Sequence, residues 1–406
     1  MSSNSLPYCI ALQPICNARL EHVADELLYR ASANAGGAVI DDQMTATARV
    51  CNAAFYETGV EALCGTRKLF FNAPREWLLK PELLPPDAEQ VVIEVLESVE
   101  GDPEVLDALQ EVKARGYTLA LDDFVLTPAT RPLLDLADII KLDMLDQPPR
   151  AGELEEYLAR DITLLAEKVE DLATFEACRE AGFSLFQGYF YARPEVKAAT
   201  AIKRSRNHGA QLQLLSELQH SEVDYDRVEQ LLAQDPQLCV RLLRMTNSAS
   251  YRRANRISSL RQALLLLGVE RLRTLVTTLV LASDDPCNML ILPQALTRAA
   301  MCERLAAQEF HTDPDAAFMT GLLSMADLML NQSVEEICAQ LPLSDGIKQA
   351  LLHRSGDLGR VLRLVIAFEQ ASIRPPSDRA VNRLNHYYLE SRSWASNVLI
   401  GLEDRA

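Results

Sequence analysis

The first half of the chain alternates short apolar runs with amphipathic stretches. Apolar runs of strand length lie at residues 8–15, 23–30, 68–72, 90–97, 116–124, 137–143, 162–170 and 183–190. Between them, apolar positions recur at helical spacing in residues 42–65, 103–115 and 171–182. Strands that alternate with helices in this way predict a parallel α/β fold, most economically a (β/α)8-like barrel.

The second half of the chain has a different pattern. Strand-like runs end near Pro194, and from about residue 198 to about residue 395 apolar positions recur at helical spacing. A chain of 406 residues is also longer than one ordinary hydrophobic core requires. We therefore predict two domains, a shortened barrel over residues 1–197 and an all-helical domain over residues 198–406.

Composition narrows the classes of function. The net charge of −17 argues against a broad surface for a nucleic-acid polymer, although a small anionic ligand held by a metal and local cations remains compatible with it. The nine cysteines lack C-x-x-C spacing, which is typical of reduced thiols. Because we find neither a signal-peptide pattern nor about 18 uninterrupted apolar residues, we expect a cytoplasmic protein without a membrane span.

Two adjacent carboxylates, Asp122 and Asp123, end the apolar run 116–124. An isolated Asp-Asp pair is most often a turn cap. In a barrel of parallel strands, however, the chemistry usually lies at the C-terminal strand ends. Other predicted strands carry polar groups at or near their ends, namely Glu26, Asn72, Glu94, Lys141, Glu167 and Gln187.

Such a set favours metal chemistry over a scatter of unrelated surface carboxylates, because charged residues are rarely buried unless they are paired or metal-bound. Oxygen ligands without His or Cys suit a hard cation such as Mg²⁺ or Mn²⁺. Two ions that share an aspartate could generate hydroxide and stabilise in-line attack on a phosphodiester. Lys141 would then orient the water or stabilise charge on the phosphoryl oxygens.

The order of short motifs over about residues 8–194 resembles the EAL domain family of cyclic di-GMP phosphodiesterases. The family patterns are QPI, EALLR, a strand-end Asn, E-x-T-E, DDF, K-I-D, E-G-V-E and QGY. The matching residues, in the same order, are Gln13-Pro14-Ile15, Glu26-Leu27-Leu28-Tyr29-Arg30, Asn72, Glu94-Val95-Leu96-Glu97, Asp122-Asp123-Phe124, Lys141-Leu142-Asp143, Glu167-Lys168-Val169-Glu170 and Gln187-Gly188-Tyr189.

The resemblance implies ligands for two metal ions. It assigns the first ion to Glu26, Asn72, Glu94 and Asp122. It assigns the second to Asp122, Asp123 and Glu167. Glu26 and Lys141 would be the catalytic pair, with Lys141 addressing the nucleophilic water.

The remaining matched positions concern the nucleotide. The resemblance implies that Arg30 contacts a ligand phosphate and that Gln13 and Gln187 also bind the ligand. Glu170 would support a loop at the site. Cyclic di-GMP is therefore the expected partner, with Mg²⁺ or Mn²⁺ as cofactor.

Two features depart from the family pattern. After Phe124 the family has GTGYSSL, a loop tied to metal binding and dimerisation, whereas this chain has Val125-Leu126-Thr127-Pro128-Ala129-Thr130. Glycine permits backbone conformations that Val and Leu resist. The domain also spans only about 190 residues, below the roughly 250 of a typical barrel. The expected ligands are retained, but their structural support is altered.

The second half resembles the HDOD family, a helical relative of HD phosphohydrolases, over about residues 200–390. The resemblance rests on residues 235–251 and 257–270. None of the six histidines adjoins an Asp, and residues 321–327 lack a His where His-Asp is expected. Metal catalysis in this half is therefore disfavoured. We interpret it as a regulatory module that binds an unidentified protein partner.

Two functional hypotheses remain open at this point. In the first, a bacterial signal-transduction protein hydrolyses cyclic di-GMP to the linear dinucleotide. In the second, a catalytically inactive barrel senses the nucleotide or serves as a scaffold, and the helical half delivers the output. The sequence does not decide whether the site turns over its ligand, whether the chain forms a homodimer, or which pathway it serves.

Overall fold

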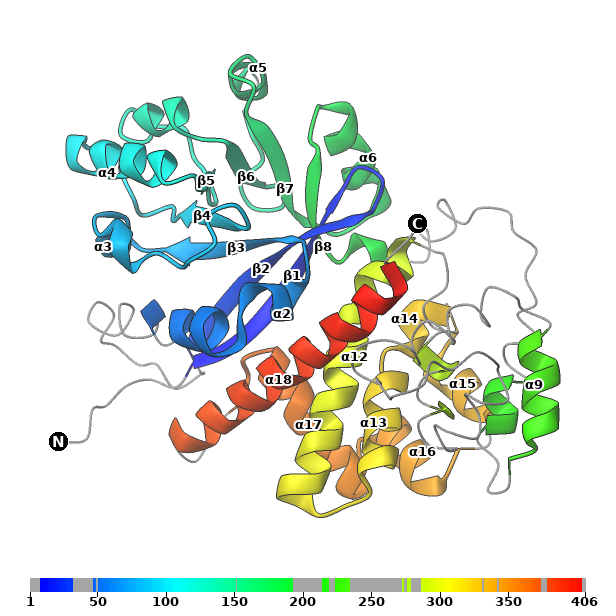
Figure 1. The fold of residues 1–406 in the computed structure, drawn as a ribbon. Helices are drawn as coiled ribbons and strands as arrows, with labels where there is room; N and C mark the ends of the chain where they lie inside the picture. The colour runs from blue at the N-terminus through cyan, green and yellow to red at the C-terminus, as the bar shows by residue number, and fades with distance from the viewer. Residues whose placement is uncertain are drawn as a thin grey trace. The chain divides into compact units, whose positions relative to one another are not determined.

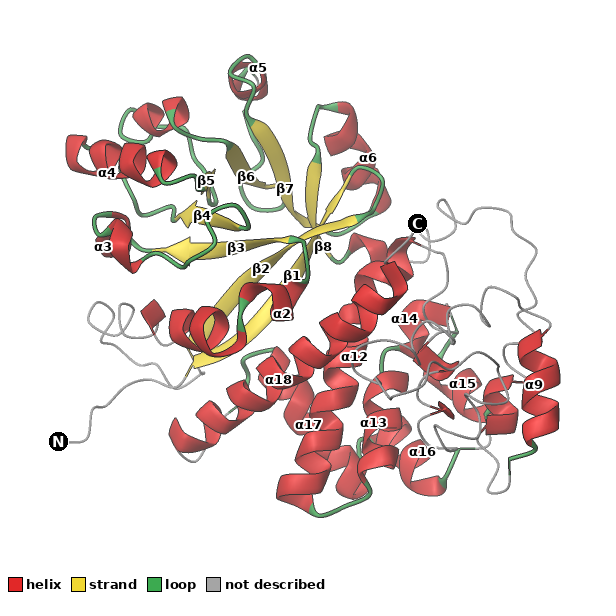
Figure 2. Cartoon of the chain, in the orientation of Figure 1, coloured by secondary structure: helices red, strands yellow, loops and turns green. Residues whose placement is uncertain are grey.

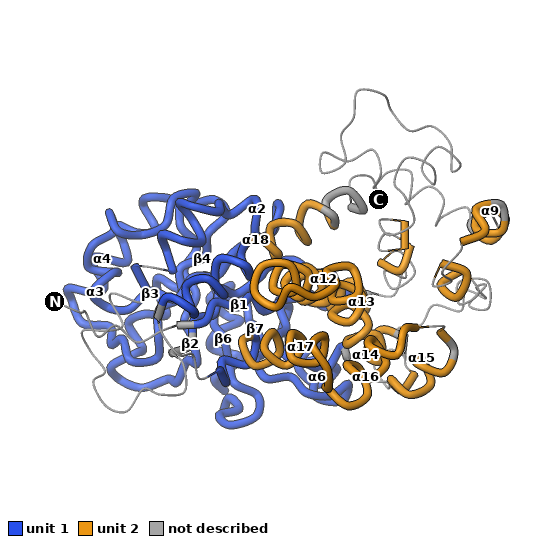
Figure 3. Tube along the Cα trace, turned by 90° about the horizontal axis from the view of Figure 1, so that it is seen from below, with its two compact units in different colours: residues 1–196, 369–389 blue, residues 197–368, 390–406 orange. Residues whose placement is uncertain are grey.

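The computed structural model describes residues 8–31, 47–48, 50–150, 152–192, 214–218, 223–233, 272–273, 276–278, 286–330, 332–341, 343–373 and 378–403. The chain divides into two compact units (Figure 3). Unit 1 contains residues 1–196 and 369–389, and unit 2 contains residues 197–368 and 390–406. Within the described ranges, no helix is both long enough and apolar enough to cross a membrane.

Unit 1 is a closed barrel of eight strands that neighbour one another in chain order (Figure 1). This matches the barrel that the alternating pattern predicts. The strands are β1 (Tyr8–Asn17), β2 (His22–Ala31), β3 (Lys68–Ala73), β4 (Val91–Val95), β5 (Thr118–Leu121), β6 (Ile139–Asp143), β7 (Thr163–Val169) and β8 (Leu185–Gly188).

The strands form where apolar runs can be buried on both faces. Every residue of β4 and β6 is buried, as expected for strands covered by helices outside and by side chains inside. One layer of the barrel interior is filled by one buried side chain from each of seven strands. These are Ile15, Ala24, Phe70, Val92, Ala120, Ile139 and Leu165.

The first strand differs from the all-parallel arrangement that the sequence pattern predicts. β1 pairs antiparallel with both β2 and β8, whereas β2 to β8 pair in parallel. The cause is the connection between β1 and β2, a tight turn in which Leu20 has a φ of 61° and its N–H donates to the Asn17 carbonyl. So short a link permits only a hairpin, because parallel strands need a crossover.

Short helices and turns make the barrel compact (Figure 2). Asp102 caps α4 (Pro103–Ala114) and Asp171 caps α6 (Leu172–Glu180), each accepting from a backbone N–H in the first turn. The helix expected over residues 42–65 is, where described, divided at Gly59. The other pieces are η1 (Asn52–Thr58), α2 (Val60–Cys64), α3 (Arg75–Leu78), η2 (Pro81–Leu83), η3 (Arg131–Asp135), α5 (Glu153–Leu158) and η4 (Phe190–Ala192).

Unit 1 also includes a segment from the far end of the sequence. The last helix, α18 (Asp378–Glu403), begins in this unit, which contains residues 369–389. The Asn385 Oδ1 accepts from the Ile10 N–H at 3.0 Å, and the Tyr388 hydroxyl accepts from the Leu12 N–H at 2.8 Å. Since β1 meets β8 only at Cys16 and Asn17, α18 satisfies donors that the β8 side of β1 leaves unpaired.

Unit 2 is helical throughout its described residues, as the sequence pattern predicts. Gly321 lets two of its helices approach closely, because a Cβ there would lie 2.7 Å from the Ala299 backbone. The segments 235–251 and 257–270, which carry most of the expected HDOD pattern, lie outside the described residues. The helices are α9 (Tyr225–Ala233), α12 (Pro286–Leu305), η6 (Ala306–Phe310), α13 (Pro314–Leu323), α14 (Ala326–Leu330), α15 (Val334–Gln340), α16 (Asp345–His353), α17 (Gly356–Glu369) and the end of α18.

Candidate active site

The barrel interior holds a buried ammonium ringed by carboxylates from different strands. Lys141, on β6, is only 1% exposed. Its Nζ lies 2.6 Å from Glu94 Oε1, 2.6 Å from Asp122 Oδ1, 3.1 Å from Glu167 Oε1 and 3.5 Å from Glu26 Oε2. The structure therefore brings together five residues that the sequence scatters over about 140 positions.

The strand register explains how these side chains meet. Neighbouring strands align Gln13 with Glu26, Asn72 with Glu94, and Asp143 with Glu167. Because side chains alternate across a strand, a polar residue within an apolar run points to the face opposite its neighbours. The polar groups of successive strands therefore reach one level of the barrel, near the C-terminal strand ends.

Glu26 is held by two amide side chains. Gln187 Nε2 donates to Glu26 Oε2 at 2.6 Å, and Asn72 Nδ2 donates to Glu26 Oε1 at 3.3 Å. These donors leave the amide oxygens of both partners, Asn72 Oδ1 and Gln187 Oε1, buried without a hydrogen-bond partner. Two uncharged oxygen donors thus lie beside the carboxylate cluster.

The cluster carries more negative charge than Lys141 can balance. Burial alone would lower the pKa of Lys141, but the surrounding carboxylates outweigh burial and hold it well above its usual value. Burial, followed by the charge of Glu26, raises the pKa of Glu94 well above its ordinary range. Burial raises the pKa of Glu167 to about 8, with Lys141 opposing and Asp122 adding to the rise. The site therefore favours an additional cation.

The chemistry of the donors fits a hard divalent cation. Several carboxylate oxygens are buried without a hydrogen-bond or ion-pair partner, namely Glu94 Oε2, Asp123 Oδ1 and Glu167 Oε2. Buried charged oxygens in this state are costly unless a cation compensates them. Among the described residues, no three Asp, Glu, His or Cys side chains are arranged to hold a metal ion. The Lys141 ammonium lies between these carboxylates. The oxygens nevertheless form the all-oxygen set that Mg²⁺ and Mn²⁺ prefer.

Asp122 and Asp123 form a turn that is held by both neighbouring strands. The Asp122 N–H donates to the Val95 carbonyl at 2.9 Å, and the Phe124 N–H donates to the Lys141 carbonyl at 3.1 Å. Asp123 adopts a left-handed φ of 42°. Burial and the adjacent Asp122 raise the pKa of Asp123. The pair is thus fixed by the backbone rather than by a glycine-rich loop.

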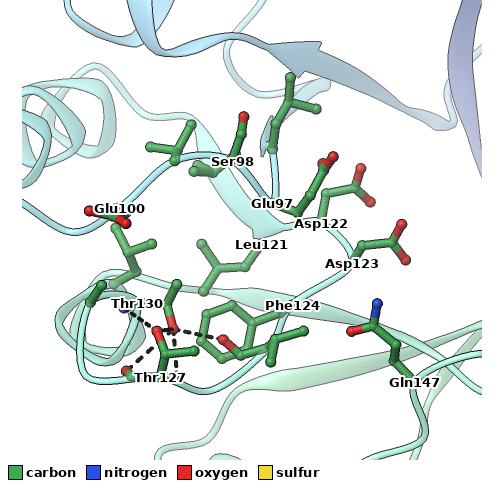
Figure 4. Close-up of a pocket in the computed structure, with 16 residues that line it drawn as sticks. Glu97, Ser98, Glu100, Leu121, Asp122, Asp123, Phe124, Thr127, Thr130 and Gln147 are labelled. Atoms are coloured by element: carbon green, nitrogen blue, oxygen red, sulfur yellow. Dashed lines mark hydrogen bonds between the residues drawn. The ribbon is translucent and has the colours of Figure 1, made fainter.

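The divergent loop after Phe124 has its own bracing. The Thr130 hydroxyl donates to the Val125 carbonyl at 2.7 Å and accepts from the Thr127 N–H at 2.9 Å. The Gly101 N–H donates to the Ala129 carbonyl at 2.9 Å. Figure 4 shows this turn beside a cavity of about 520 Å³, on whose wall the Asp122 and Asp123 side chains lie next to each other. Threonine hydroxyls and one contact to the β4–α4 connection therefore hold this loop without glycines of its own.

Lys168 is a charged residue of the site that the sequence motifs did not lead us to expect. Lys168, on β7, has a left-handed φ of 51°, and its Nζ donates to Asp143 Oδ2 and lies 3.5 Å from Asp146 Oδ2. The sequence marks this position, because the lysine in Glu167-Lys168-Val169-Glu170 occupies the glycine position of the E-G-V-E pattern. A second lysine therefore lies next to an expected metal ligand.

The other expected site residues lie on or next to the barrel strands. Gln13 is half-buried on β1 opposite Glu26. Arg30 belongs to β2, in register with Cys9, and its side chain lies outside the described set. Glu170 is exposed and directly follows β7.

The sequence is similar to known proteins over both halves of the chain. Residues 208–354 match the HDOD domain family. Cyclic di-GMP phosphodiesterase CdgJ of Vibrio cholerae is 37% identical over 372 residues, which cover 89% of this chain and 85% of CdgJ. YuxH of Bacillus subtilis is 31% identical over 406 residues, covering 96% of this chain and 98% of YuxH. The chain belongs to the EAL–HDOD family.

Among solved structures, a standalone EAL protein of Vibrio cholerae in its c-di-GMP-bound form is similar to this EAL–HDOD chain. It is 24% identical, with a TM-score of 0.37, and the match covers 47% of this chain and 93% of that protein. An EAL domain protein of Listeria monocytogenes is 22% identical, with a TM-score of 0.36, over 48% of this chain and 92% of that protein.

In the HDOD unit of this EAL–HDOD protein, the stretch 321–327, which lacks a histidine, contains Ser324 and Asp327. The Ser324 hydroxyl donates to the Gly321 carbonyl at 2.7 Å and lies 3.1 Å from Arg298 Nη1, which donates to it. Asp327 Oδ1 is buried without a hydrogen-bond partner. A guanidinium therefore lies against a hydroxyl in this stretch, and the non-catalytic role of the helical half stays a prediction.

Proposed function

We propose that this EAL–HDOD protein is a divalent-metal-dependent phosphodiesterase that opens cyclic di-GMP to the linear dinucleotide. The observation that carries the proposal is the buried Lys141 ammonium within 3.5 Å of four carboxylates, which come from four other strands or their ends. The name of the relative CdgJ, a cyclic di-GMP phosphodiesterase, supports the same activity.

The proposed metal ligands follow the sequence resemblance. Glu26, Asn72, Glu94 and Asp122 would hold one Mg²⁺ or Mn²⁺ ion, and Asp122, Asp123 and Glu167 would hold a second. When bound, such ions lower the pKa of a ligated water and neutralise charge on the phosphoryl oxygens. The unpaired buried oxygens of Asn72, Glu94, Asp123 and Glu167 are the observation in favour of this assignment.

The protein's own side chains would bind and orient the substrate. The Lys141 ammonium would donate a hydrogen bond to the attacking water or to a phosphoryl oxygen, where developing negative charge strengthens it. Gln187 and Asn72 would keep the Glu26 carboxylate in one orientation through their amide N–H groups. Gln13 and Arg30 would contact the nucleotide, and Glu170 would support the loop after β7.

The helical HDOD unit would act as the output module of a bacterial cytoplasmic signalling protein. We assign it binding of a protein partner rather than chemistry, because residues 321–327 lack the histidine of a His-Asp metal-binding pair. A homodimer belongs to the same proposal, because the family pattern ties the loop after Phe124 to dimerisation.

Turnover and binding of cyclic di-GMP should be measured on the same purified full-length chain. With Mn²⁺ or Mg²⁺ we expect the linear dinucleotide as product, and with a chelator we expect no product. Binding without turnover would instead identify a catalytically inactive sensor, the alternative function. A chain that neither binds nor hydrolyses the nucleotide would be left with the scaffold role alone.

A further inference from the structure

Lys168 adopts a backbone conformation that a lysine rarely takes. Its φ of 51° is left-handed, the region that glycine enters freely and that other residues enter only at a cost. The E-G-V-E pattern has glycine at this position, so this chain has placed a lysine where the backbone disfavours one. A strained residue beside a functional site is a reason to look for a function of its side chain.

The Lys168 side chain is anchored in one place. Its Nζ donates to Asp143 Oδ2 and lies 3.5 Å from Asp146 Oδ2. Asp143 is buried, and its other oxygen accepts from the Leu145 and Asp146 N–H groups at 2.8 and 2.9 Å. Asp143 is fixed by these bonds, and it anchors the half-exposed Lys168 ammonium.

Lys168 lies next to one expected metal ligand of the cluster, Glu167. Lys168 directly follows Glu167, and Glu167 is in register with Asp143 on the neighbouring strand. Burial and the Asp122 charge raise the pKa of Asp123, and the charge of Lys168 opposes this rise. Lys141, by contrast, contacts Glu26, Glu94, Asp122 and Glu167.

We propose that Lys168 is a resident cation that selectively weakens divalent-metal binding at the Asp122–Asp123–Glu167 position. This inference rests on the proposed function. A positive charge next to Glu167 repels a dication held by Glu167 and partly neutralises Asp143, whereas Glu26, Asn72 and Glu94 lie on other strands, β2, β3 and β4. The two ions should therefore bind with different affinities, and the weaker one should fill only at higher metal concentration.

The test is Mn²⁺ binding to the full-length chain by titration calorimetry, with free Mn²⁺ followed by electron paramagnetic resonance. Wild type should show a tighter and a weaker class of site. Lys168→Gly and Lys168→Met should each tighten the weaker class about tenfold and leave the tighter class unchanged. Lys168→Met keeps the left-handed residue and removes only the charge, whereas Lys168→Gly also removes the strain.

Lys113→Met is the matched control, because Lys113 Nζ also pairs with an aspartate, Asp138, at 2.6 Å but lies on α4. It should bind Mn²⁺ as wild type does.

If both Lys168 variants bind Mn²⁺ as wild type does, or if Lys113→Met tightens the weaker class equally, the inference is overturned and the proposed function stands. A wild-type chain that binds no Mn²⁺ overturns both. Thermal unfolding confirms that the variants fold, and we expect Lys168→Gly to fold readily because glycine adopts this φ without strain.

Discussion

At the scale of single residues, the barrel unit buries charge that it can only partly compensate. Lys141 is paired with four carboxylates, and the negative charge that one ammonium does not neutralise requires another cation. Removing one member of a buried charge cluster is far more damaging than removing a surface pair, because the remaining charges stay buried without a partner. Lys141 is therefore as important for the metal-free fold as for the proposed chemistry.

Lys141→Met should lower the free energy of unfolding of the metal-free protein by about 3–5 kcal/mol, since four carboxylates lose their common partner. Denaturant unfolding in the presence of a chelator measures this loss. Lys113→Met removes a partly exposed pair and should change the same quantity by less than about 1 kcal/mol. Equal effects of the two substitutions would contradict the central position of Lys141.

The raised carboxyl pKa values predict how metal-free stability changes with pH. A carboxyl whose pKa is raised by folding contributes stability that is present below its unfolded pKa and is lost as pH rises through its folded pKa. With the Glu167 pKa at about 8 and those of Glu94 and Asp123 also raised, metal-free stability should fall between about pH 5 and about pH 8.

Thermal unfolding across this pH range, with chelator and with saturating Mn²⁺, checks the prediction. The Tm should fall with rising pH only in chelator, because the metal requires deprotonated ligands. Glu167→Gln should flatten the fall. A metal-free Tm that rises over the same range would show that these carboxyls are ionised in the folded chain at low pH.

At the scale of elements, the barrel depends on a helix that is almost the whole chain length away in sequence. β1 is antiparallel, pairs with β8 over only two residues and receives hydrogen bonds from Asn385 and Tyr388 of α18. β1 also carries Gln13, opposite Glu26. The edge of the barrel nearest a proposed ligand-binding residue is thus completed by α18.

Asn385→Ala should destabilise unit 1 by about 1–3 kcal/mol, because the Ile10 N–H would be left buried without an acceptor. Tyr388→Phe should cost about 1 kcal/mol through the Leu12 N–H. Hydrogen exchange should show faster exchange of the Ile10 and Leu12 amides in these variants. Asn397→Ala, an exposed asparagine on the same helix, should leave both amides protected.

At the scale of the whole molecule, the sequence predicted the parts of the fold that depend on local pattern. The runs 68–72 and 90–97 became β3 and β4, and Asn72 and Glu94 lie in register because parallel strands start and end at one level. The barrel with a helical second half was predicted for the same reason. The predicted domain boundary between residues 197 and 198 stays a prediction, because α18 contributes residues to both units.

Other features could not be predicted because they depend on geometry rather than on pattern. The antiparallel direction of β1 depends on the turn after Asn17, which lacks an Asn-Gly or Asp-Gly signal. The contact of Asn385 with Ile10 joins residues 375 positions apart. The left-handed φ of Lys168 and the Thr127–Thr130 hydrogen bonds that brace the divergent loop likewise have no signal in the local pattern.

The most direct test of the proposed active site is the rate of cyclic di-GMP hydrolysis by Glu26→Ala, compared with wild type and with Glu21→Ala, at saturating Mn²⁺. Glu26 lies within the cluster, whereas Glu21 is exposed in the turn before β2. We predict a fall of at least about 100-fold for Glu26→Ala and a near-normal rate for Glu21→Ala. Hydrolysis by Glu26→Ala at the wild-type rate would contradict the assignment of this cluster as the active site.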